Sequence, residues 1–98
     1  MISAGGDKAV AKQDSSTDTH FVERVQTGVR IERRMLKVLK ALAEYLDMTL
    51  GDLLEGIVLH AFDGKTPFQS ETLAKIDQLK TVYGLDLDAS ASHRLTES

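Results

Sequence analysis

Less polar and more polar residues alternate strictly over one short stretch of the chain, positions 24–31. The less polar positions are Val25, Thr27, Val29 and Ile31, and the more polar positions are Arg24, Gln26, Gly28 and Arg30. A period of two places successive side chains on opposite faces of an extended backbone. The alternation therefore predicts a β-strand over 24–31 that has one apolar face and one polar face.

The spacing of apolar residues changes to three and four immediately after this strand. It predicts two amphipathic helices, over 32–46 and 50–62. Thr49 is a good N-cap for the second helix, and Asp52 in its first turn suits the helix dipole. The apolar positions are Met35, Leu36, Leu39, Leu42, Ala43 and Leu46 in the first helix, and Leu50, Leu53, Leu54, Ile57, Val58, Ala61 and Phe62 in the second.

A third helix is predicted over 71–83, after a linker that contains the only proline. Ser70 would cap its N-terminus, and Gly84 would end it in the left-handed conformation. Residues 1–19 contain almost no large apolar side chains, so they are predicted to be disordered. The expected organisation is this N-terminal tail, a domain over 20–63, a linker and helix over 64–84, and a loose tail over 85–98.

Composition excludes several classes of chemistry. The chain has no cysteine, so it has no disulfide and no thiolate metal ligand or nucleophile. The three histidines are too scattered to predict a metal site, and no phosphate-binding glycine loop or catalytic triad is recognisable. We therefore expect neither an enzyme nor a cofactor. No apolar stretch is long enough for a membrane helix or a signal peptide, so a cytoplasmic protein is expected.

Charge is distributed unevenly along the chain. The net charge of −3 argues against binding to nucleic acid through bulk electrostatics alone. Between Phe21 and Phe62, however, all six basic residues lie before position 41, where only Glu23 and Glu32 oppose them. This local excess of positive charge is compatible with binding to nucleic acid through specifically placed side chains.

The predicted strand needs a partner, because a single strand leaves its ladder hydrogen bonds unmade. The sequence offers no second strand of comparable quality. The same strand of a second copy, paired antiparallel about a two-fold axis, is therefore the expected partner. The fold class predicted in this way is mainly α with one short β-strand per chain, assembled as a homodimer.

The stretch ERVQTGVRIERRMLKVLKALAEYLDMTLGDLLEGIVLHAF resembles the ribbon-helix-helix DNA-binding proteins of the MetJ, Arc and CopG class. Strand length, helix lengths and the position of the turn carry the resemblance, which covers less than half of the 98 residues. It implies a homodimer with an intermolecular antiparallel ribbon, here extended by a C-terminal helix. In this class the ribbon enters the major groove of double-stranded DNA.

The resemblance assigns base contacts to Arg24, Gln26 and Arg30, on the outward face of the ribbon. Arginine can pair with guanine, and glutamine with adenine, through two hydrogen bonds each. Gly28 occupies the central outward position, where many members have a polar side chain. It would allow a close approach to DNA or mark a bulge.

The resemblance also implies phosphate contacts at the start of the second helix. The Thr49 hydroxyl and the backbone amides of Leu50 and Gly51 would hold a phosphate there, because a helix N-terminus presents unpaired amides and a partial positive charge. Further phosphate contacts are expected from the first turns of the first helix, at Arg33, Arg34 and Lys37.

The expected function is that of a transcriptional regulator, a repressor, which binds double-stranded DNA as a dimer or as paired dimers and is associated with the nucleoid when bound. Two alternatives stay open. In the first, the chain is an antitoxin whose C-terminal helix covers a toxin. In the second, it is a helical dimerisation module without a role on DNA.

Overall fold

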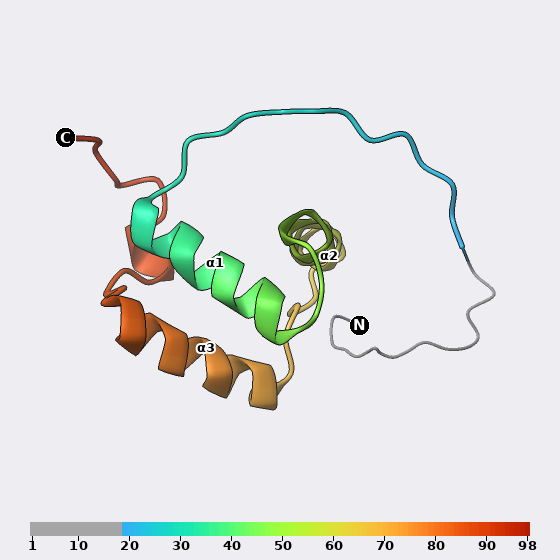
Figure 1. Cartoon of the computed structure of the whole chain (residues 1–98). Coiled ribbons are helices and arrows are strands. Elements are labelled where there is room, and N and C mark those ends of the chain that lie inside the picture. The colour runs from blue at the N-terminus through green and yellow to red at the C-terminus, as the bar shows by residue number, and fades with distance from the viewer. Residues whose placement is uncertain (1–18) are drawn as a thin grey trace.

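The computed structural model describes residues 19–98, which form three α-helices and one short 3₁₀-helix (Figure 1). The helices α1, α2 and α3 span Arg33–Tyr45, Leu50–Phe62 and Ser70–Tyr83, and the 3₁₀-helix η1 spans Ala89–Ala91. The bounds of α1, α2 and α3 lie within one residue of the expected ones. The expectation of disorder falls on residues 1–18, outside the described residues, and on residue 19.

Residues 19–32, the N-terminal arm, form neither helix nor strand. The prediction of a strand over 24–31 is therefore wrong, and so is the fold class of a ribbon-helix-helix homodimer built on it. The described chain is a three-helix structure. The physical reason is that a strand exists only through hydrogen bonds to a neighbouring strand. No described segment provides one, and the arm arches over the helices before it joins α1 (Figure 1).

The α1 helix is defined by local interactions at both ends. Glu32 is its N-cap, because Glu32 Oε1 accepts a hydrogen bond from the Met35 amide at 2.8 Å. After the helix, Asp47 adopts a left-handed conformation with φ 62°, and the Met48 amide bonds to the Ala43 carbonyl at 3.0 Å. These contacts satisfy the last carbonyls of α1 and turn the chain toward α2.

The α3 helix starts one residue earlier than expected. Gln69 is at the N-cap position and Ser70 is the first helical residue, so Ser70 is not the cap. Gly84 ends the helix with φ 67°, and the Leu85 amide bonds to the Lys80 carbonyl at 2.8 Å. Residues 85–98, the C-terminal segment, then return to the N-terminal end of α1 (Figure 1).

The core lies where the three helices meet. Leu42 and Leu53 are its most deeply buried side chains, with exposed fractions of 2% and 0%. Figure 1 shows α1 and α3 side by side, with α2 viewed nearly end-on beside α1. The core cluster consists of Leu42, Ala43, Leu46 and Leu53, surrounded by Leu39, Met48, Ile57, Phe68, Ile76 and Leu79.

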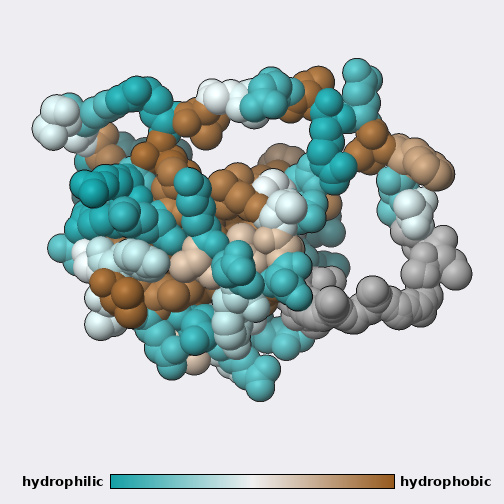
Figure 2. Space-filling view, viewed as in Figure 1, coloured by the Kyte–Doolittle hydropathy of each residue, from teal (hydrophilic) through white to brown (hydrophobic). Residues whose placement is uncertain are grey.

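Much apolar surface stays outside this core. Leu53 is the one buried residue of α2, whereas Val58, Leu59 and Phe62 are 43%, 64% and 82% exposed. Figure 2 shows apolar atoms reaching the surface below the arm. None of the helices formed by the described residues has the length and apolar character needed to span a membrane.

Candidate nucleic-acid interface

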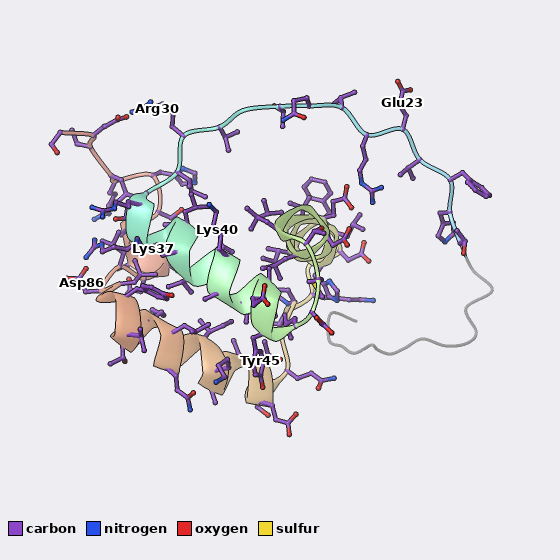
Figure 3. All side chains as sticks on the ribbon, in the orientation of Figure 1. Glu23, Arg30, Lys37, Lys40, Tyr45 and Asp86 are labelled. Carbon is purple, nitrogen blue, oxygen red and sulfur yellow. The ribbon has the colours of Figure 1, made fainter. Side chains whose placement is uncertain are left out.

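The described residues divide into a basic part and an acidic part. Residues 20–40, the arm and the first half of α1, contain six basic and two acidic residues, a formal charge of +4. Residues 41–98 contain four basic and ten acidic residues, a formal charge of −6. Figure 3 shows Arg30, Lys37 and Lys40 following one another from the base of the arm along α1. Charge is therefore separated along the sequence, although three of the six cations of residues 20–40 pair with carboxylates of residues 41–98.

Arg24 connects the arm to α2. Its Nε and Nη2 atoms donate to the two carboxylate oxygens of Glu55, each at 2.8 Å, and Asp52 lies 4.0 Å away. The hydrogen bond to Glu55 raises the pKa of Arg24, and the same bond lowers the pKa of Glu55. The Arg24 side chain is 63% exposed, so a phosphate can reach it. The guanidinium is held beside the first turns of α2.

The start of α2 is a capped helix N-terminus in which two backbone amides make no hydrogen bond within residues 19–98. Thr49 Oγ1 accepts from the Asp52 amide, and the Thr49 carbonyl accepts from the Leu53 amide, both at 3.0 Å. Within residues 19–98, the amides of Leu50 and Gly51 donate to no acceptor. A Cβ at Gly51 would lie 3.9 Å from Thr49 Oγ1 and meet nothing closer, so this end is open. An oxyanion can approach these amides directly.

Gln26 and Gly28 lie in the middle of the arm and are exposed. No described atom comes within 4 Å of a Cβ built at Gly28. The expected apolar face of this stretch is equally uncovered, because Val25 and Val29 are 77% and 80% exposed. The structure therefore places Gln26 and Gly28 together on an open stretch of chain, without bringing them to the α2 N-terminus.

Arg30 and Arg34 contact the C-terminal segment. Arg30 forms a two-point ion pair with Glu97, in which Nε donates to Oε1 at 3.1 Å and Nη2 donates to Oε2. Arg34 Nη1 donates to Asp86 Oδ1 at 3.0 Å and to the Gly84 carbonyl at 2.9 Å. Sequence reasoning missed both contacts, because no local pattern relates residues 52 and 67 positions apart.

Hydrogen bonding and charge shift three more pKa values at this end. The hydrogen bond that Arg30 donates to Glu97 raises the pKa of Arg30, and the one that Arg34 donates to Glu32 raises the pKa of Arg34. The Met35 amide, followed by Arg34, lowers the pKa of Glu32. All these groups stay charged near neutral pH, so the N–H groups of Arg30 and Arg34 that bind carboxylates reach an anion only after those carboxylates have been displaced.

The other cations of α1 are freer. Arg33, Lys37 and Lys40 are exposed, and none of them forms an ion pair with a described carboxylate. Lys37 lies 6.0 Å from the centre of the Tyr83 ring, at the outer limit of a cation–π contact. These side chains can pair with phosphates without breaking a bond first. Lys40 was not assigned to the site by sequence reasoning, although its place on α1 follows that of Lys37.

No group of three or more histidine or acidic side chains among residues 19–98 is placed to hold a metal ion. No protein-family model matches the sequence, and comparisons with curated proteins and with solved structures found no match. The likeness to ribbon-helix-helix proteins thus rests on the sequence pattern alone.

Proposed function

We propose that this chain binds double-stranded DNA and regulates transcription as a repressor. The observation that carries the proposal is the separation of charge, with a formal +4 on residues 20–40 and −6 on residues 41–98. A local cluster of exposed cations attracts the phosphate backbone and releases its counterions. Acidic side chains outside the contact surface repel DNA, which favours the orientation in which the cations face it. The proposal places the chain in the cytoplasm, on the nucleoid when bound.

The phosphate contacts come from two places in the structure. The open amides of Leu50 and Gly51, next to the Arg24 guanidinium, hold one phosphate at the α2 N-terminus. The cations of α1 hold the flanking backbone. Phosphate contacts position a protein on DNA, whereas base contacts give sequence preference. We assign the base contacts to Gln26 and Arg30, because both side chains lie on the exposed arm.

A second copy of the chain completes the DNA-binding unit in this proposal. Among residues 19–98 the core holds five buried hydrophobic residues, a small number for a segment of this length. Val58, Leu59 and Phe62 on α2, and Val25 and Val29 on the arm, are left exposed. Burial of these side chains between two copies would stabilise both. A two-fold symmetric dimer, alone or with a second dimer, would bind a palindromic or repeated site.

We prefer a regulator to an antitoxin because of how α3 is used. A helix that covers a toxin needs a free apolar stripe, but Ile76 and Leu79 of α3 pack against the core of this chain. The exposed apolar residues left on α3 are Leu73, Val82 and Tyr83, at 49%, 72% and 37%. They are spread over the length of the helix.

The proposal is tested by fluorescence anisotropy with labelled, mixed genomic DNA fragments at two salt concentrations. We expect binding that weakens as salt rises. The double variant Arg33→Gln, Lys40→Gln should weaken binding and reduce the salt slope by up to about 0.9 for each lost phosphate contact. The double variant Lys65→Gln, Lys75→Gln removes the same charge from the acidic part and should bind nearly as the unmodified protein does. Absence of binding at low salt would contradict the proposal.

A further inference from the structure

The C-terminal segment reaches the same cations that the DNA contacts require. Glu97 binds Arg30 through both carboxylate oxygens, and Asp86 binds Arg34 at 3.0 Å. A guanidinium bound by two carboxylate oxygens presents the same donors that it would present to a phosphate. While these pairs exist, neither arginine has its full set of donors available for DNA.

The segment is held in place by a small amount of packing. Leu85 and Leu87 are half-buried, and no residue of 85–98 is fully buried. Asp88 Oδ1 accepts from the Ser90 amide at 2.9 Å and caps η1, while His93 adopts a φ of 66°, which residues other than glycine rarely do. The segment thus has some structure of its own, but little that fixes it to the helices.

A cavity of about 400 Å³ lies beneath the segment. Met35, Val38 and Ile76 line it from α1 and α3, and Leu87 and Leu95 line it from the segment. Side chains that border this water-accessible pocket are already partly hydrated on that side, so their contribution to docking is reduced. When the segment detaches, less apolar surface becomes newly exposed to water than would be exposed if the segment were fully packed.

We propose that the C-terminal segment is a built-in competitor of DNA, which occupies Arg30 and Arg34 with Glu97 and Asp86 until DNA displaces it. This inference rests on the proposed function. Both ion pairs are largely exposed at Arg30, Glu97 and Asp86, and exposed pairs are individually weak. DNA can displace them, but the observed affinity is lowered by the fraction of molecules in which the segment is docked. The same factor applies to every DNA that needs these arginines, so the segment sets how tightly the chain binds rather than which sequence it prefers.

The test uses the full chain with the double variant Asp86→Asn, Glu97→Gln. Because two weak exposed pairs are removed, we expect DNA affinity to rise by about three- to tenfold. The double variant Glu44→Gln, Asp77→Asn is the matched control. It changes the net charge equally at two exposed carboxylates that form no ion pair among residues 19–98. Competition predicts a larger gain for the first variant than for the control, whereas bulk repulsion predicts equal gains.

A double-mutant cycle tests whether Glu97 acts through Arg30. In a protein that carries Arg30→Gln, the further change Glu97→Gln should raise affinity no more than loss of an unpaired carboxylate does, because its partner is gone. If the unmodified protein binds DNA but Asp86→Asn, Glu97→Gln behaves as the control does, the competitor is contradicted and the proposed function stands. If none of the proteins binds DNA, both are contradicted. If the unmodified protein binds at low salt and removal of the two carboxylates extends binding to higher salt, both are supported.

Discussion

The N-terminal arm and the helical body, which consists of α1, α2 and α3, both have a regular apolar pattern, but only the body folds as its pattern predicts. The arm has a strict two-residue alternation, and the body has apolar residues at spacings of three and four. The body folds within one chain, and Leu42 and Leu53 become almost fully buried. The arm does not, and Val25 and Val29 remain about as exposed as the arm's polar residues. The difference lies in where each structure finds its hydrogen bonds.

A helix satisfies its backbone groups four residues away, so periodicity and capping residues are sufficient to place it. A strand depends on a neighbour that its own sequence does not specify. For this reason Thr49 and Gly84 were recognised as helix boundaries from the sequence, whereas residues 24–31 were assigned a strand that the chain does not form. Alternation describes which faces an extended segment would have, but it does not supply the partner.

The largest predicted effect is a difference in the free energy of unfolding between variants of the helices and variants of the arm. Leu53→Ala removes a side chain that is 0% exposed, and it should lower the free energy of unfolding by about 2–5 kcal/mol. Val29→Ala, at a position 80% exposed, should change it by less than about 0.5 kcal/mol in dilute protein. Urea unfolding followed by circular dichroism measures both.

The same Val29→Ala measurement over a range of protein concentrations tests whether a second copy covers the arm. If a second copy covers the arm, the cost of Val29→Ala should grow with concentration, because association stabilises the folded chain by mass action. A large loss in dilute protein would instead mean that the single chain already buries Val29, and that the arm belongs to the body.

A smaller effect is expected at Thr49, where the body supplies a cap and the proposed site needs an open amide cluster. Thr49→Ala should lower the free energy of unfolding by about 1 kcal/mol, because the bond from the Asp52 amide is lost. Thr49→Asp keeps a good cap and should retain stability, but its charge would repel a phosphate at Leu50 and Gly51. DNA titration should therefore show weaker binding for Thr49→Asp than for a Thr49→Ser control. Equal affinities for the two would exclude the α2 N-terminus from the interface.

The candidate site was partly accessible from sequence. Basic residues before position 41 and the helix N-terminus at Thr49 follow from local patterns. The pairing of Arg24 with Glu55 and of Arg30 with Glu97 does not, because tertiary folding brings together residues 31 and 67 positions apart. Glu32 was assigned to the first turn of a helix, but it lies one position outside and caps it. An error of one residue at a helix end changes the role of the side chain.

The smallest predicted effect concerns the junction of arm and body at Glu32. The Met35 amide, and then Arg34, lower the pKa of this carboxyl, so its ionised form is favoured in the folded chain. A lowered pKa contributes stability that is present above the unfolded-state value of 4.5 and is lost as pH falls through the folded value. Melting temperatures measured between pH 6 and pH 3 should therefore fall less for Glu32→Gln than for the unmodified chain. Glu44→Gln, at an exposed position of the same helix, serves as the control and should follow the unmodified chain. If Glu32→Gln loses stability in acid as steeply as the control does, then the Glu32 carboxylate does not secure the point where arm and body join.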